Sequence, residues 1–234
     1  AGLTDPGYRE EAVRQYRQMI PQIFAGIRHT LRGSMKSVQA WLRGGDGRFA
    51  VPEEAVLAGY EVADVKAWLQ DSMAKDYLEI SLIGDLDADA ALPLILKTFG
   101  ALPKRADKKT IDPALRKLAY PETPAEKGFS YESKIPNAAA LIAWKIPSMA
   151  NNVAETRRLN IVANILDDRM RKKIREELGA SYSPSANASA SDAFDFGVLN
   201  AFSQGKPEDS EKVGKLIIEI GQKLAADGAT QDEL

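Results

Sequence analysis

The sequence predicts an α+β fold, with a mixed or antiparallel sheet and helices packed on one of its faces. Three observations support this fold class. Apolar residues recur at helical spacing from Leu159 to Leu178, apolar or small residues alternate with polar ones from Ser181 to Ser191, and residues 138–146 form an apolar run. A period of about 3.6 residues indicates an amphipathic helix, and alternation indicates a half-buried strand. At 234 residues the chain is long enough to bury one large core or two smaller ones.

In the first half of the chain, the spacing of apolar residues predicts a helix from Tyr8 to Ile20. Pro21 should end this helix, because proline disfavours the helical conformation at the residue before it. A further helical region is expected from Pro52 to Met73, and it includes Trp68, which we expect in the core. Residues 77–83 alternate between apolar and polar and give the clearest strand of this half.

The best domain boundary follows a helix that is expected over residues 90–99. Residues 104–128 contain five Lys, two Arg and three Pro and lack a sustained apolar period, as linkers do. The sequence therefore predicts two regions, residues 1–103 and 129–234, joined by this linker.

In the second half, residues 129–135 and the apolar run at 138–146 should form a sheet pair, with the apolar run as a central strand. A further hypothesis is that residues 1–103 and 129–234 together form a single permuted domain. In that case a strand near residues 78–83 would pair with this sheet and complete it.

A long helix should come next, because Asn152 and Glu155 resemble a capping box and Gly179 supplies a stop. Residues 181–191 then predict a strand with one hydroxyl-rich face, and Pro184 favours a sheet edge or a bulge. The antiparallel neighbour of this strand and a helix over the sheet are expected at residues 196–204 and 213–224.

Composition argues against several kinds of function. Thirty-one basic and thirty-three acidic residues give a net charge of −2, which argues against nucleic acid or an anionic membrane as a partner. No apolar run reaches the roughly 20 residues that span a bilayer. The chain has no Cys and only one His, His29, whereas a zinc site takes three or four ligands, His and Cys foremost. We expect His29 at the surface or in packing, and no metal-binding residue in this chain.

The most specific motif is Arg-Glu-Glu-Leu-Gly-Ala-Ser-Tyr at residues 175–182, where an Arg at a helix end is followed by a Tyr that opens a strand. Four further segments precede it in the chain: Gly45–Phe49, Val65–Leu69, Ile83–Asp87 and Thr98–Pro103. In this order and spacing, the segments resemble large, four-module bacterial members of the insulinase/pitrilysin (M16) family of zinc peptidases.

The resemblance implies M16-like modules. Residues 1–103 would be the end of one module and residues 129–234 the first half of the next, in the half of the protein that carries no zinc. Family members bind zinc through His-x-x-Glu-His in their first module, and this motif is absent here. A capping box at Thr230–Glu233 stands one residue before the end of the sequence, which also suggests a piece of a longer polypeptide.

The resemblance assigns substrate binding to Arg175 and Tyr182 and no catalytic residue to this chain, which alone is predicted to be inactive. Its partners would be a peptide or unfolded polypeptide and the zinc-binding half of the same protein. Zinc would belong to the N-terminal half of an active parent, in the bacterial periplasm or cytoplasm. The carboxylate pairs Glu176–Glu177 and Asp167–Asp168 are expected to face solvent, because adjacent positions on a helix point about 100° apart.

Two alternatives stay open at this point. The parent could be a scaffold or peptide-binding protein from a catalytically inactive M16 homologue. The chain could also be an independent peptide-binding module, in which the small-residue strand at 181–191 accepts a peptide by strand addition.

Overall fold

The structure is a computed structural model that describes residues 2–122, 126–150, 152–179 and 183–233. The chain divides into two units: residues 1–23 with 52–111, and residues 24–51 with 112–234. The assignment of residues 1–103, 104–128 and 129–234 to two modules and a linker stays a prediction.

The helix expected to stop before Pro21 continues through it, so this prediction was wrong. Helix α1 spans Glu10–His29, with Pro21 inside it. A proline inside a helix costs about 3 kcal/mol. On either side of it Ile20 is 2% exposed and Phe24 is 9% exposed. Burial of two such side chains contributes about 1.5–3 kcal/mol each, which is enough to offset the proline.

The first unit also contains α3 (Glu54–Gly59), α4 (Val62–Lys75) and α5 (Ala88–Thr98). Polar contacts hold both ends of α4. At its start, Arg17 donates to the carbonyl of Tyr60 at 2.7 Å and pairs with Glu61. At its end, Arg105 donates through Nε to the carbonyl of Asp76 at 2.6 Å. Its guanidinium also donates to the carbonyls of Met73 at 2.9 Å and Ser72 at 3.1 Å, and so provides partners for carbonyl groups at the helix end.

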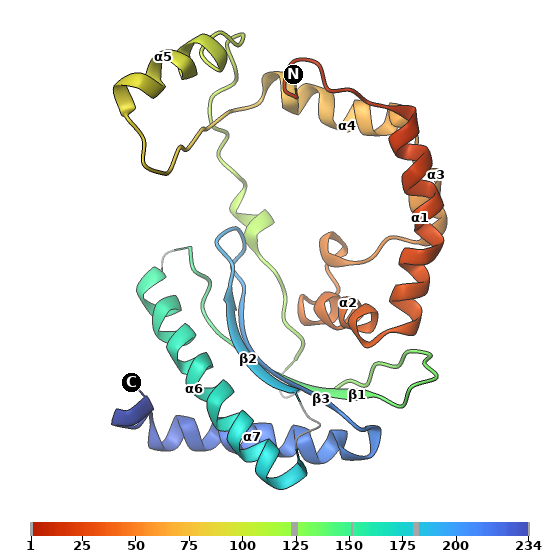
Figure 1. The fold of residues 1–234 in the computed structure, drawn as a ribbon, viewed down its shortest axis with the longest axis vertical. Helices are drawn as coiled ribbons and strands as arrows, with labels where there is room; N and C mark the ends of the chain where they lie inside the picture. The colour runs from red at the N-terminus through yellow and green to blue at the C-terminus, as the bar shows by residue number, and fades with distance from the viewer. Residues whose placement is uncertain (1, 123–125, 151, 180–182, 234) are drawn as a thin grey trace. The chain divides into compact units, whose positions relative to one another are not determined.

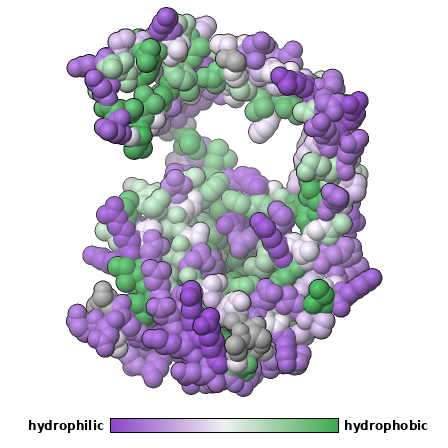
Figure 2. Space-filling view, viewed as in Figure 1, coloured by the Kyte–Doolittle hydropathy of each residue, from purple (hydrophilic) through white to green (hydrophobic). Residues whose placement is uncertain are grey.

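The strand expected at residues 77–83 does not form, and Trp68 is not in the core. Residues 77–83 have no regular secondary structure and pair with no strand, Ile83 is 97% exposed and Trp68 is 80% exposed. The alternation of apolar and polar residues at 77–83 predicted a strand wrongly. A strand also needs the backbone groups of a neighbouring strand as hydrogen-bond partners, and alternation within one segment does not supply them. Apolar side chains of α5 are also exposed, and Figure 2 shows the hydrophobic surface there; they are Leu92, Leu94 and Leu96.

The second unit contains a three-stranded antiparallel sheet of β1 (Ala138–Lys145), β2 (Ser183–Ala190) and β3 (Gly197–Gly205), in the order β1-β3-β2 (Figure 1). The antiparallel pairing of β2 with β3 was predicted, and β2 lies at an edge, which was one of the two positions that Pro184 favoured.

The predicted central position of residues 138–146 was wrong, since β1 lies at an edge of this sheet. Strand β3 is the central strand of this sheet. Its consecutive residues Val198 and Leu199 point to opposite faces and are only 3% and 6% exposed, so both faces of β3 are covered. Residues 129–135 form no strand, and neither they nor residues 77–83 join the described sheet.

Helices α6 (Val153–Leu178) and α7 (Ser210–Asp227) pack on the same side of the sheet (Figure 1). Gly221 allows α7 to pack closely on β1, because a Cβ at this position would lie only 2.9 Å from the Trp144 ring. The core lies between these layers and consists of Ile146, Ala163, Ile165, Leu166, Met170, Ile174, Leu199, Ala201, Val213, Leu216, Ile217, Ile220 and Leu224.

The ends of α6 differ from each other in how they are capped. Asn152 stands at the N-cap, but its side chain makes no capping hydrogen bond, so the predicted capping box does not form. Gly179 ends the helix as predicted, with φ +90° and its N–H bonded to the carbonyl of Arg175 at 3.0 Å. Glycine suits this position because other residues rarely adopt positive φ.

Helix α2 (Leu31–Leu42) completes the second unit. The hydroxyl of Thr30 caps it by accepting from the N–H of Gly33 at 3.0 Å. A Cβ at Gly33 would lie 2.3 Å from the carbonyl oxygen of Ile27, so only glycine lets α1 and α2 meet this closely. Within the described residues, no helix has the length and apolar character needed to cross a membrane.

Two neighbouring isoleucines of α7 test the position of the core. Ile217 is 0% exposed and Ile218 is 39% exposed. We expect Ile217→Ala to lower the free energy of unfolding by about 2–5 kcal/mol, through lost burial and the cavity that remains. The matched variant Ile218→Ala should cost less than about 1 kcal/mol. Chemical denaturation measures both, and equal losses would contradict this packing.

The second stability prediction concerns pH. Arg169 binds Glu233 through two contacts of 2.7 Å, and hydrogen bonding to this guanidinium lowers the pKa of the Glu233 carboxyl to about 2. A carboxyl with a lowered pKa stabilises the fold above its unfolded pKa of about 4.3, and this contribution disappears as pH falls towards 2. Glu233→Gln should therefore reduce the loss of thermal stability between pH 5 and pH 2, whereas Asp232→Asn should not. Identical melting profiles for wild type and Glu233→Gln would refute the pair's role.

Candidate functional site

Arg175 lies in the last turn of α6 and is exposed. Within the described residues, its guanidinium has no hydrogen bond or ion pair. Three other cations of the same helix are engaged, in the pairs Arg169–Glu233, Arg171–Asp167 and Lys173–Glu177, whereas Arg157 and Lys172 are exposed like Arg175. Arg175 therefore presents a permanent positive charge with five donor N–H groups to whatever approaches this helix end.

The second predicted binding residue, Tyr182, lies outside the described residues, so its joint role with Arg175 stays a prediction. Strand β2 begins at the next residue, Ser183. Glu176 and Glu177 are exposed, as predicted. The pKa of Glu177 is lowered, chiefly by its hydrogen bond with Lys173.

Asp167 does not face solvent, contrary to the prediction. Its side chain is 15% exposed, and its carboxylate accepts a hydrogen bond from the N–H of Ala186 at 2.9 Å and pairs with Arg171 at 2.7 Å. The Asp167–Arg171 spacing of four could have revealed the ion pair from the sequence. The bond to Ala186 could not be seen there, because it depends on how β2 lies against α6. Asp168 is exposed, as predicted.

This bond also limits strand addition at the edge of β2. Successive residues of a strand direct their N–H groups to opposite sides, so the N–H groups of residues 184, 186, 188 and 190 point away from β3. Pro184 has no N–H, and that of Ala186 is occupied by Asp167. Only Ala188 and Ala190 are left as edge donors. The half of β2 that follows Tyr182 therefore offers no free N–H group to a peptide strand.

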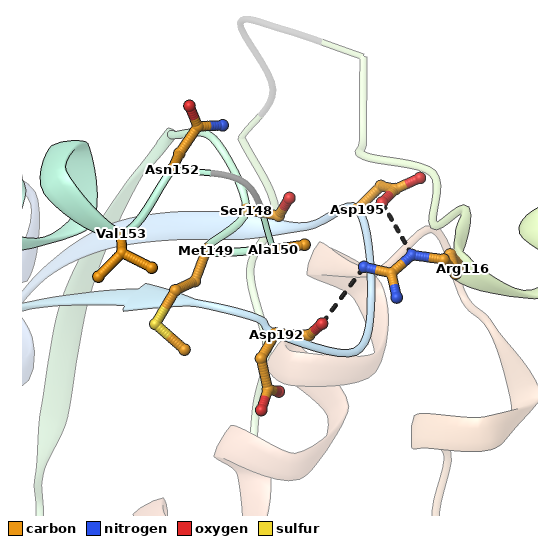
Figure 3. Close-up of a pocket in the computed structure, with 8 residues that line it drawn as sticks. All are labelled: Arg116, Ser148, Met149, Ala150, Asn152, Val153, Asp192 and Asp195. Carbon is orange, nitrogen blue, oxygen red and sulfur yellow. Dashed lines mark hydrogen bonds and ion pairs between the residues drawn. The ribbon is translucent and has the colours of Figure 1, made fainter. Parts of the chain in front are cut away.

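A pocket of about 480 Å³ lies where the β2–β3 hairpin meets the start of α6 (Figure 3). Arg116 donates to the carbonyl of Asp192 at 3.2 Å and contacts the Asp195 carboxylate at 3.4 Å. The N–H of Asp195 donates a hydrogen bond of 2.8 Å to the carbonyl of Arg116. The lining residues are Arg116, Ser148, Met149, Ala150, Asn152, Val153, Asp192 and Asp195.

This hairpin pocket is far from Arg175. Along α6, Val153 and Arg175 are separated by about 33 Å, at about 1.5 Å per residue. The charge of Arg116 is matched by Asp195, and no described lining residue is a thiol or imidazole. The contacts of Arg116 fasten residues 112–116 to the hairpin rather than prepare a catalytic group.

Tyr120 makes a second attachment between the segment that follows Arg116 and the sheet. Its hydroxyl donates to the carbonyl of Gly197 at 3.0 Å and accepts from the N–H of Gly197 at 2.8 Å. Its ring stacks on Phe196 with centroids 4.6 Å apart. The C-terminal part of the predicted linker is thus held against β3.

A second, smaller pocket of about 220 Å³ lies at the opposite end of the sheet, where β2 begins and β3 ends. We call it the sheet-end pocket; its lining residues are Pro136, Asn137, Ser183, Gln204, Gly205 and Lys206. Ser183 directly follows Tyr182, so this pocket adjoins the predicted binding motif in the chain. Sequence reasoning missed it because its residues come from three separate segments, none of which carries a motif.

The described residues include no group of three or more His, Cys, Asp or Glu side chains that could hold a metal ion. His29 lies at the surface, with its side chain 51% exposed and its Nδ1 3.2 Å from the carbonyl oxygen of Glu132.

Residues 60–234 match the family described as the peptidase M16 inactive domain. The chain belongs to the M16 peptidase family. The predicted family is thereby confirmed, and the M16 inactive domain lacks the catalytic zinc site. No match is found among curated proteins.

Solved M16 structures share the fold. An M16 inactive domain from Pseudomonas fluorescens superimposes with a TM-score of 0.74 at 18% identity, covering 99% of this chain and 55% of that one. The periplasmic protease PqqL from Escherichia coli gives a TM-score of 0.64 at 16% identity, covering 96% of this chain and 25% of that one.

A mutant of the ferredoxin protease FusC, solved in complex with Arabidopsis ferredoxin, gives a TM-score of 0.66 at 16% identity, with 95% of this chain and 24% of that one covered. This M16 chain therefore spans about half of the first structure and about a quarter of the other two. The α+β fold class is confirmed by these superpositions.

The bond between α6 and β2 gives the stability prediction for this site. Asp167→Ala leaves the N–H of Ala186 without its acceptor, and loss of a hydrogen bond to a charged group costs about 1.5–3 kcal/mol. The neighbouring variant Asp168→Ala removes an exposed carboxylate and should change the free energy of unfolding by less than about 0.5 kcal/mol. Hydrogen exchange of the Ala186 amide should also accelerate in Asp167→Ala alone. Unchanged protection of that amide would mean that the bond does not hold β2.

Proposed function

We propose that this chain is the non-catalytic, substrate-binding part of an M16 zinc endopeptidase. The observation that carries the proposal is the exposed guanidinium of Arg175, which has no partner among the described residues while the arginines at 169 and 171 on the same helix are paired. The match to the M16 inactive domain supports a role other than catalysis for this chain.

The chemistry of the two predicted residues suits a polypeptide backbone. A guanidinium stays charged at every physiological pH and donates hydrogen bonds to carbonyl oxygens. The phenol of Tyr182 adds a neutral donor. Together they would orient a peptide and donate hydrogen bonds to its carbonyl oxygen as negative charge develops there during hydrolysis. The zinc would be held by the N-terminal half of the same protein.

The solved relatives support a polypeptide as the ligand. PqqL is described as a protease, and FusC was solved in complex with a ferredoxin, which is a protein. Because the superpositions cover about a quarter of those chains, the peptide, the zinc-binding half and the cleavage activity are proposals for this protein.

Variants of the intact protein test this function. Arg175→Ala and Tyr182→Phe should each lower turnover of a peptide substrate by about 10²-fold, because one lost oxyanion donor costs about 10²–10³ in other enzymes. Lys172→Ala, an exposed cation on the same helix, serves as the matched control and should keep wild-type turnover. Zinc content, measured by elemental analysis, should be the same in all variants. Full turnover in both Arg175→Ala and Tyr182→Phe would overturn the proposal.

A second candidate is a scaffold or peptide-binding protein from a catalytically inactive M16 homologue. The match to an inactive domain is compatible with it, as is the lack of His-x-x-Glu-His in this chain. The coding sequence of the parent distinguishes the two candidates directly. If that motif is absent throughout, Arg175→Ala should weaken peptide binding without any turnover to lose.

A further inference from the structure

We propose that the sheet-end pocket binds a carboxylate of the polypeptide that Arg175 and Tyr182 hold. This inference rests on the proposed function and adds a ligand class to it. The carboxylate can come from an Asp or Glu side chain or from the C-terminus of the peptide, and the experiment below distinguishes these sources.

The position of the pocket follows from the strand register. Ser183 at the start of β2 pairs with Gln204, and Ala138 at the start of β1 pairs with Gly205. All three strands therefore end at this point, and Gly205 contributes no side chain to fill the space between them. The resulting volume of about 220 Å³ is smaller than the roughly 300–1,000 Å³ of pockets for whole small molecules. It suits a single side chain or a chain end.

The lining chemistry favours an acceptor. The side chains of Asn137, Ser183, Gln204 and Lys206 can all donate hydrogen bonds, and no carboxylate is among the described lining residues. An ionised carboxylate is an acceptor only, so it can use every one of these donors. A cationic side chain would instead meet the like charge of Lys206.

The ammonium of Lys206 is available for such a contact. Lys206 is exposed, and its side chain has no hydrogen bond or ion pair with any described residue. Two other lysines of this unit are engaged within their own helices, Lys173 with Glu177 and Lys215 with Glu211. Glu208 follows two positions after Lys206 without pairing with it. An incoming carboxylate therefore does not have to displace an existing partner.

The pocket adjoins the proposed binding residues along the chain. Ser183 follows Tyr182 directly, and Arg175 stands in the last helical turn eight residues before Ser183. The first half of the β2 edge, where Asp167 occupies the N–H of Ala186, has no free N–H group with which to pair a peptide along that strand. A peptide held at its backbone by Arg175 can place one neighbouring carboxylate in the sheet-end pocket.

The experiment measures binding of fluorescein-labelled neutral dodecapeptides to the intact protein by fluorescence anisotropy. In one series a Gln is replaced by Glu at each position in turn, and in the other the C-terminal amide is replaced by the free acid. We expect wild type to bind the carboxylate peptide about three- to fivefold more tightly than its neutral counterpart in one of the two series, as for a partly exposed ion pair. The preference should shrink in high salt. The series that shows it identifies the source of the carboxylate.

Lys206→Met should abolish this preference while leaving the affinity for the neutral peptides unchanged. Lys223→Met, an exposed lysine of α7 outside the pocket, should retain it. Equal binding of acidic and neutral peptides by wild type, or a preference that survives in Lys206→Met, would overturn the inference. Arg175→Ala separates it from the proposed function, because that variant should lose affinity for acidic and neutral peptides alike. If Arg175→Ala binds both normally, the proposed function fails, and the Lys206 comparison still decides the pocket.

Discussion

Burial of α6 against the sheet is the constraint on which the rest of the second unit depends. Met170 and Ile174 are fully buried in the core under α6, and this fixes the rotation of the helix about its axis. Neighbouring residues of a helix point about 100° apart. Once Ile174 is in the core, Arg175 is turned outwards and becomes exposed. The proposed contact with a polypeptide thus depends on an apolar interaction on the other side of the same helical turn.

Polar contacts then divide the second unit into two ends with different properties. At the hairpin end, Arg116 pairs with Asp195 and Tyr120 bonds to Gly197. The segment that carries Arg116 and Tyr120 is thereby held to the hairpin, and the charge of Arg116 is neutralised. At the opposite end, Arg175 and Lys206 have no partner among the described residues. Asp167 connects the two by holding β2 to the middle of α6. Both of these cations, Arg175 and Lys206, are therefore at the end of the unit away from the hairpin pocket.

The first unit shows how far amphipathic patterns depend on a partner surface. Its apolar residues are spaced as in packed helices and strands, yet in the described residues Ile20 and Val62 are its only buried apolar side chains. The large exposure of Trp68, Ile83 and Leu94 shows that periodicity predicts which face of an element is apolar. It does not predict which other element covers that face.

The sequence by itself determined the elements whose signals are local. The apolar stripes of α6 and α7, the alternation in β2, the stop at Gly179 and the M16 motif at residues 175–182 are all properties of neighbouring residues. Only the tertiary structure decided the order β1-β3-β2, the passage of α1 through Pro21, the bond of Asp167 to Ala186 and the sheet-end pocket. These features depend on contacts between residues far apart in the chain. The free energy of such contacts, whether from burial or from pairing of backbone groups, exists only after the segments have met.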